Sequence, residues 1–263
     1  MIDGEYLVEL RDGTIKQVNP FTGTEVWTVP GRGNRPLSTP ASNPRPLEPG
    51  QELRACAFCQ DRYLETPPEK SRVVREGDGF RTRHGTTAEE LFETVAEFRR
   101  VPNLFEILSY DYWHLNYGYE LPDWIRDRRD AYLASEAGRA HVLSVVAAKL
   151  RASGHTPEGV AALGERELLR RASAVFGGGH DVVIARRHFV DGATDDSALA
   201  SSGTLTPDEH GAFLAYTVEA AERMLTFNRY ARYVTVFQNW LKPAGASFDH
   251  LHKQLVAIDE HGN

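Results

Sequence analysis

The sequence predicts an α+β fold in which an antiparallel β-sheet is flanked by helices. Residues 5–30 alternate apolar and polar side chains around two turn signals, which is typical of a β-meander. Residues 120–175 instead place apolar side chains three and four positions apart, which predicts two or three amphipathic helices. Short strand-like runs then follow at 181–185, 233–239 and 254–258. Strands at both ends of the chain and helices between them indicate one mixed fold.

Residues 31–50 are rich in Pro, Gly, Asn, Ser and Arg, and therefore predict an extended loop with little core of its own. The segment 87–100 is expected to form a helix. Its apolar positions have helical spacing, and Thr87 is followed three residues later by Glu90, the pattern of a capping box.

A second capping box predicts a helix that begins at Pro207 and ends near Asn228. Thr206 and Glu209 have the required spacing, and proline is favoured at the first helical position because it has no N–H to leave unpaired. The loop from Gly245 then leads into the last predicted strand.

The composition is that of an ordinary globular protein, with 41% hydrophobic and 25% charged residues among 263. Lysine and arginine number 30 against 37 aspartates and glutamates, a net charge of -7, which argues against a protein that coats nucleic acid or an anionic membrane. No run is apolar enough to span a bilayer, and the acidic start does not resemble a signal peptide, so we expect a cytosolic protein.

Two cysteines, Cys56 and Cys59, are separated by two residues. A secreted disulfide-rich domain would need more cysteines, whereas this spacing in a reducing compartment is typical of metal or redox chemistry. The pair alone does not choose between these two kinds of site.

Polar side chains that could take part in catalysis lie near the C-terminus, at His250, His252 and Gln254. Residues two apart on a strand point to the same face, so these side chains can converge on one pocket. The preceding Gly245–Ser247 turn offers backbone N–H groups, which suits a phosphate. One imidazole could attack phosphorus while the amide donates to a phosphoryl oxygen. The alternative interpretation is a pair of exposed histidines on an edge strand.

The segment GASFDHLHKQ (245–254) resembles the active-site segment of the galactose-1-phosphate uridylyltransferase-like family of the histidine-triad (HIT-like) superfamily. Four further segments resemble blocks of that family and occur in its order. They are NPFTGTEVWTVPGRGNRP (19–36), CAFCQDRYLETPPE (56–69), VPNLFEIL (101–108) and HDVVIARRHF (180–189). The resemblance implies a HIT-like antiparallel sheet with flanking helices.

By this resemblance, residues 1–109 and 177–263 form a HIT-like nucleotidyltransferase domain of the N-terminal type. Residues 110–176 have no counterpart in the family pattern and are predicted to be a helical insertion. The matching blocks cover about half of a family member, and family members continue with a second, related half that helps to hold the sugar.

The resemblance also implies a closed, structural zinc site, since thiolate and imidazole are good zinc ligands and the metal takes four. The implied ligands are Cys56, Cys59, His188 and His250. His114 and His180 are the alternative fourth ligands. A redox role for the cysteine pair is disfavoured, because no βαβ pattern surrounds it and proline-rich loops flank it.

In the family, the histidine that matches His252 attacks the α-phosphorus of a nucleoside diphosphate sugar and expels the sugar 1-phosphate. A second phosphate then attacks the nucleotidyl-histidine. The resemblance further implies that Gln254 bridges phosphoryl oxygens, that Ser247 donates to a phosphate, and that Arg32 and Arg35 hold phosphates bidentately. The family's arginines come from the neighbouring subunit, which implies a homodimer.

Substrate contacts are implied for four more residues. Ala57 and Phe58 match the positions that sandwich the base, although Phe58 could equally be a core anchor under the cysteine loop. Asn103 matches a nucleoside-contacting asparagine, and Asn239 either positions substrate or caps the turn that follows it.

The predicted function is therefore the exchange of a nucleoside monophosphate between a nucleotide sugar and a sugar 1-phosphate, as in a UDP-glucose–hexose-1-phosphate uridylyltransferase, in a protein that binds Zn²⁺. Leu251 replaces the family's usual proline between the two histidines, and dinucleoside polyphosphate phosphorylases share the His-x-His-x-Gln pattern. The alternatives are a phosphorylase or hydrolase of dinucleoside polyphosphates or nucleotide sugars, and a non-catalytic, zinc-stabilised nucleotide-binding module.

Overall fold

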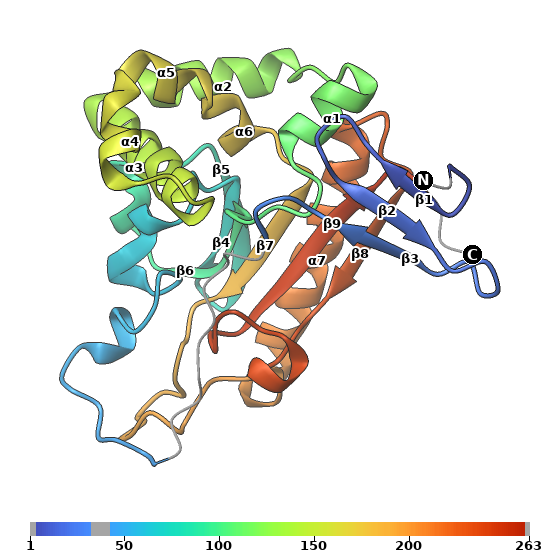
Figure 1. The fold of residues 1–263 in the computed structure, drawn as a ribbon. Coiled ribbons are helices and arrows are strands. Elements are labelled where there is room, and N and C mark those ends of the chain that lie inside the picture. Colours follow the sequence, from blue (N-terminus) through green and yellow to red (C-terminus); the bar gives the residue numbers. More distant parts are fainter. Residues whose placement is uncertain (1–3, 33–42, 261–263) are drawn as a thin grey trace.

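The computed structural model describes residues 4–32 and 43–260, which form two antiparallel sheets and seven α-helices (Figure 1). The α+β prediction is confirmed. The smaller sheet has the order β1-β2-β3 and the larger the order β5-β4-β6-β7-β9-β8. The strands are β1 (Leu7–Glu9), β2 (Ile15–Val18), β3 (Glu25–Thr28), β4 (Ser71–Glu76), β5 (Gly79–His84), β6 (Ala96–Pro102), β7 (His180–Ala185), β8 (Tyr233–Phe237) and β9 (His252–Ile258). The helices are α1 (Tyr110–Tyr117), α2 (Asp123–Ala134), α3 (Glu136–Ala152), α4 (Pro157–Ala162), α5 (Gly164–Arg170), α6 (Ala172–Phe176) and α7 (Pro207–Phe227).

The β-meander predicted for residues 5–30 is present as β1–β3, and it is fastened to the end of the larger sheet. Lys16 is buried and lies 3.3 Å from Asp259 and 3.0 Å from Glu260, which directly follow β9. Trp27 stacks on Tyr112 of α1, with ring centroids 6.4 Å apart. These contacts hold the small sheet beside β9 and β8, as Figure 1 shows.

The helix predicted for residues 87–100 is wrong. Glu90 does accept hydrogen bonds from the backbone N–H and hydroxyl of Thr87, but only a single 3-10 turn, Glu90–Phe92, follows. The next residues form β6, which is buried along its whole length between β4 and β7. Arg99 and Arg100 of this strand are buried and paired with carboxylates. Hydrogen bonding of this strand to β4 on one side and β7 on the other outweighed the helical spacing of its apolar residues.

One face of the larger sheet is covered by α7, which begins with the predicted capping box of Thr206 and Glu209. Phe213 of this helix stacks on Phe98 of β6 at 4.8 Å between centroids, and Tyr216 shares a hydrogen bond of 2.7 Å with Ser71 of β4. Lys253 of β9 also points to this side, where its amine lies 4.0 Å from the centre of the Phe213 ring.

The other face of β7 and β9 carries the predicted site residues. In the antiparallel register His252 lies opposite Ile184, and Gln254 lies opposite Val182. Side chains directly opposite each other project to the same face, and those two apart along a strand do as well. His180 therefore shares this face with His252 and Gln254.

After α1, five helices (α2–α6) follow one another from Asp123 to Phe176, more than the two or three that periodicity predicted for residues 120–175. Among them α3 packs toward the cysteine loop through a buried hydrogen-bond chain. Tyr132 of α2 lies 2.7 Å from His141 Nδ1, and His141 Nε2 donates to the backbone carbonyl of Thr66 at 2.8 Å. This chain ties α3 to the residues that follow the two cysteines.

Replacing the buried Asp181 with asparagine is expected to lower the free energy of unfolding by about 3–5 kcal/mol, the usual cost of removing one partner of a buried ion pair. Asp181 lies 2.6 Å from both Lys70 and Arg100. Although burial opposes ionisation, these two cations lower the pKa of Asp181. Urea denaturation at pH 7 measures the loss.

The stabilisation by Asp181 is present above the carboxyl pKa of the unfolded chain, roughly 3.9, and is lost as the pH falls through the lower folded value. The difference between wild type and D181N should therefore shrink in acid. The matched control is Glu76→Gln, which breaks an exposed pair with Arg81 and should cost less than about 1 kcal/mol. An equal loss for both variants would contradict the prediction.

Candidate active site

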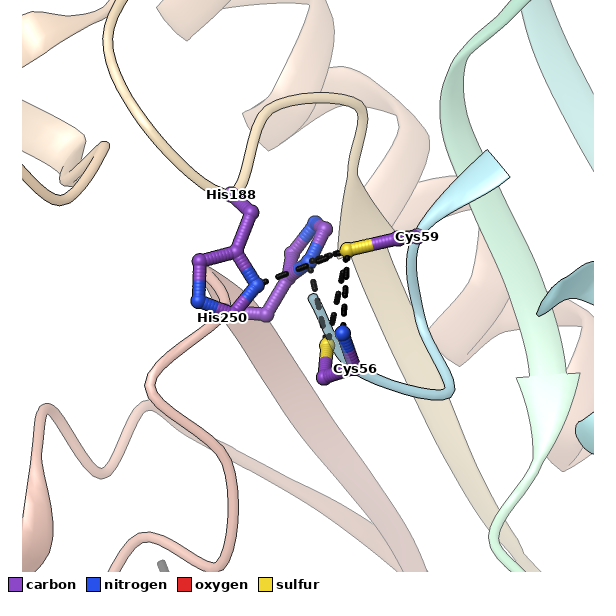
Figure 2. A group of neighbouring side chains, drawn as sticks. All are labelled: Cys56, Cys59, His188 and His250. Atoms are coloured by element: carbon purple, nitrogen blue, oxygen red, sulfur yellow. Dashed lines mark hydrogen bonds between the residues drawn. The ribbon is translucent and has the colours of Figure 1, made fainter. Parts of the chain in front are cut away.

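Four predicted metal ligands from three distant segments meet in one cluster, with their side chains pointing toward one another (Figure 2). Cys56 and Cys59 precede the 3-10 turn Gln60–Glu65, His188 follows β7, and His250 precedes β9. Their ligand atoms all lie within 4.8 Å of one another.

The spacing within this cluster fits a tetrahedral zinc ion. Zinc–sulfur and zinc–nitrogen bonds of about 2.3 and 2.05 Å require edges of about 3.8 Å between two sulfurs and about 3.6 Å between sulfur and nitrogen. The two Sγ atoms are 3.8 Å apart. Cys56 Sγ and His250 Nδ1 are 3.5 Å apart, as are Cys59 Sγ and His188 Nδ1. The donor set could therefore hold a zinc ion.

The orientation of His250 supports the same conclusion. Its Nε2–H donates to the backbone carbonyl of Ala185 at 2.6 Å, so Nδ1 carries the lone pair that faces the sulfurs. The alternative ligands lie elsewhere: His114 Nδ1 donates to the carbonyl of Tyr119, and His180 lies beside Gln254. Thiol and imidazole contacts also lower the pKa of Cys59, first through the Cys56 thiol and then through His188 and His250.

His252 is the first residue of β9, and its ring has one defined hydrogen bond. Nδ1–H donates to the backbone carbonyl of His250 at 2.7 Å, which leaves the lone pair on Nε2. Burial lowers the pKa of His252 to about 4, so the ring is neutral at physiological pH. The edge of the Phe58 ring lies against this histidine, with centroids 5.4 Å apart. His252 is thus a neutral imidazole whose position is fixed by the strand that the metal cluster anchors.

A cavity of about 810 Å³ is lined by Phe58, whose ring contacts His252, while His252 itself is not among the residues that line it. It brings together four of the predicted binding residues, which are Ala57, Phe58, Asn103 and Ser247. Phe58 packs on Phe248 at 4.4 Å and on His252, and it also contacts the small apolar cluster of Val101, Val182 and Ile184. Both interpretations of Phe58, base contact and anchor under the cysteine loop, are compatible with this position.

The sequence did not indicate that α3 forms a wall of this cavity. Ser144, Ala148 and Arg151 of α3 line it together with residues of the cysteine loop. These residues were assigned to a helical segment with no family counterpart, and the fold of the chain alone brings them to the cavity. Arg151 is exposed and adds a positive charge to an otherwise largely apolar wall.

Gln254 belongs to a partly buried polar group, of which Asn103 lines the cavity. Its Oε1 is 3.1 Å from His180 Nε2 and 3.5 Å from Asn103 Nδ2. Sequence reasoning placed Gln254 and Asn103 at the site, but it considered His180 only as a metal ligand. A histidine at the start of an otherwise apolar strand was the available signal.

The remaining predicted residues are less closely grouped. Arg32 donates to the backbone carbonyl of Phe105, and its charge contributes, after burial, to lowering the pKa of His180. It therefore lies near the Gln254 group within the same chain. Asn239 lies near Gly245 in the loop between β8 and β9. Arg35 lies outside the described residues, and its role as a phosphate contact stays a prediction.

This chain is similar to one family model and to several solved structures, including two from Arabidopsis thaliana. A family model described as "Domain of unknown function (DUF4921)" matches residues 10–263. An ADP-glucose phosphorylase from Arabidopsis thaliana with bound ADP-glucose matches at 18% identity and a TM-score of 0.40, over 94% of this chain and 49% of that one. A GALT-like protein from the same plant matches at 18% and 0.40, over 89% and 47%. The chain thus spans about half the length of these structures. No curated protein matches it significantly.

None of the helices within residues 4–32 and 43–260 is long and apolar enough to cross a membrane.

Proposed function

The chain belongs to the DUF4921 family, a domain family of unknown function, and from its site we propose that the protein transfers a nucleoside monophosphate through a covalent intermediate on His252. The observation that carries the proposal is the environment of His252. Its Nδ1–H is held by a backbone carbonyl, its Nε2 carries the lone pair, and the Phe58 ring in contact with it lines a cavity of about 810 Å³. Fold stability does not require a neutral histidine, an amide and a cavity in this combination.

In the proposed first step, Nε2 of His252 forms a bond to the α-phosphorus of a nucleoside diphosphate sugar. The bond between that phosphorus and the bridging oxygen breaks, and the sugar 1-phosphate leaves with the electron pair. The ring gains positive charge as it reacts, and the backbone carbonyl of His250, 2.7 Å from Nδ1, stabilises that charge. A second sugar 1-phosphate then attacks the same phosphorus and returns His252 to its neutral form.

The other residues bind and orient in this proposal. The Gln254 amide and the Ser247 hydroxyl donate to phosphoryl oxygens, and Arg32 supplies positive charge near Gln254. Phe58 and Asn103 contact the nucleoside in the cavity. Zinc held by the four-residue cluster would fix the cysteine loop and the start of β9 in place. In this arrangement residues 110–176 are an insertion that closes the cavity through α3.

Intact-mass analysis tests the proposal. The zinc-loaded protein is mixed separately with UDP-glucose, ADP-glucose and diadenosine tetraphosphate. We expect one donor to add the mass of one nucleoside monophosphate to the protein, which also identifies the base. Sugar 1-phosphate, inorganic phosphate or buffer alone is then added to the isolated adduct.

Each acceptor gives a different conclusion. Release by glucose 1-phosphate or galactose 1-phosphate supports a transferase, release by phosphate a phosphorylase, and release in buffer a hydrolase. If no donor yields either an adduct or a released product while the nucleotide still binds, the protein is a binding module and the proposal is wrong.

A further inference from the structure

His180 is a histidine that the proposed chemistry leaves without a role. It is the first residue of β7, on the sheet face that carries His252 and Gln254, and it is 0% exposed. A buried ring needs partners for both of its nitrogens, and His180 has them. The partner of each nitrogen determines where the ring carries its proton.

The backbone fixes the tautomer of His180. The N–H of Ile107 donates to Nδ1 at 3.0 Å, so this nitrogen carries the lone pair. Burial, followed by the charge of Arg32, lowers the pKa of His180 to about 3, and the ring is neutral at physiological pH. A neutral imidazole has one N–H, and here it is on Nε2.

The Nε2–H of His180 in turn fixes the amide of Gln254. Nε2 lies 3.1 Å from Gln254 Oε1, so it donates to that oxygen. Asn103 provides a second donor: its Oδ1 accepts from the N–H of Phe105 at 2.9 Å, which turns its Nδ2 toward the same oxygen at 3.5 Å. The reversed amide would set its NH2 group against two N–H donors. His180 Nε2 and Asn103 Nδ2, themselves 3.0 Å apart, are then both N–H donors, and Gln254 Oε1 is the acceptor near both when its NH2 group is directed away from His180.

We propose that His180 is a positioning residue for Gln254, which it holds with the amide NH2 group presented to a phosphoryl oxygen of the substrate. The Ile107 N–H fixes the tautomer of His180, and the His180 N–H in turn fixes the orientation of the Gln254 amide. The identity of the bound oxygen rests on the proposed function, whereas the donor and acceptor directions in the chain from Ile107 through His180 to Gln254 rest on the structure alone. A donor without charge stabilises the phosphoryl oxygens that gain negative charge during transfer.

Two matched variants separate positioning from simple packing. In His180→Gln the side-chain amide can place an N–H near the position of Nε2, whereas His180→Asn reaches only the position of Nδ1. The rate of adduct formation is measured in a single turnover with saturating UDP-glucose or ADP-glucose, whichever reacts. We expect His180→Asn to lose about 10- to 100-fold, the range for residues that orient a ligand-binding side chain, and His180→Gln to recover most of that loss.

A double-mutant cycle tests whether the effect passes through Gln254. His180→Asn should add less than about 2-fold to the loss caused by Gln254→Ala, because the amide that it orients is already gone. An equal loss in both backgrounds, or an unchanged rate in His180→Asn alone, would overturn the inference. Zinc content and melting temperature are recorded for every variant, so that a folding defect is recognised.

A readout that needs no activity separates this inference from the proposed function. The two-bond ¹H–¹⁵N spectrum of the zinc-loaded protein should show His180 as the neutral Nε2–H tautomer. If His180 is found instead as the Nδ1–H tautomer or as a charged ring, the proposed donor and acceptor directions are refuted even when the enzyme is active. If the wild type forms no adduct, the proposed function fails but the spectrum still decides the tautomer. His180→Asn should then raise the dissociation constant of UDP-glucose or ADP-glucose, and His180→Gln should leave it close to the wild-type value.

Discussion

Replacing His252 with alanine is expected to abolish formation of the nucleotidyl adduct, with a loss of at least about 10⁴-fold in the rate of transfer. The variant removes the only atom that the proposed first step bonds to phosphorus, and loss of a nucleophile typically costs about 10⁶-fold. His252 donates only to the backbone carbonyl of His250, so the variant should fold and keep its zinc. Intact mass and single-turnover kinetics measure the loss.

A suitable control is His84→Ala, because His84 is an exposed histidine at the edge strand β5 and lies outside the site. This variant should form the adduct at the wild-type rate. Turnover retained in His252→Ala at more than about one-hundredth of the wild-type rate would exclude His252 as the nucleophile. If His252→Ala loses zinc and folded structure, its lost turnover does not test the nucleophile. The rate of adduct formation is then measured in His252→Asn, which keeps a polar side chain at the start of β9.

Removal of the metal is expected to have the largest effect on stability. Cys59→Ser, or a chelator added to the wild type, should reduce bound zinc well below one ion per chain and destabilise the protein by several kcal/mol. The upper bound is the roughly 10–16 kcal/mol with which small peptides hold structural zinc at pH 7. The cluster joins the cysteine loop, the segment after β7 and the start of β9, and without metal these three segments lose their common anchor.

Metal analysis and thermal melting measure this effect, and His114→Ala is the matched control. His114 was the alternative ligand, but it bonds to the carbonyl of Tyr119 instead, so its removal should leave the zinc content unchanged. Wild-type zinc content in Cys59→Ser would contradict the assignment of the cluster. So would a loss of zinc in His114→Ala.

The sequence predicted the fold best where the signal was local. The capping box at Thr206 and the alternation in residues 5–30 depend on neighbouring residues, and both elements are present. The segment 87–100 was predicted wrongly because the spacing of its apolar residues and its capping signal do not show which strands pair with it or what its arginines contact. Only the tertiary structure provides Glu69 and Asp181 as their buried partners.

In the site, too, local signals were predicted from the sequence and tertiary contacts were not. The cysteine pair was visible from its spacing, and resemblance to family blocks supplied His188 and His250, which the structure brings into one cluster. The role of His180 depends on a backbone N–H more than seventy positions away and on the register between β7 and β9. Neither can be read from a single sequence, because strand register and loop paths are settled by packing.

The position of α3 on the cavity links the stability of this helix to ligand occupancy. Ser144 and Arg151 line the same cavity as Phe58 and Ser247, so a nucleotide bound there contacts parts of the chain that are remote in sequence. Such a ligand favours the closed arrangement by about 2.7 kcal/mol at one hundred times its dissociation constant. Amide protons of α3 that exchange through separation of the helix from the cysteine loop would then exchange about one hundred times more slowly. The helical segment thereby becomes a reporter of nucleotide binding, whether or not transfer follows.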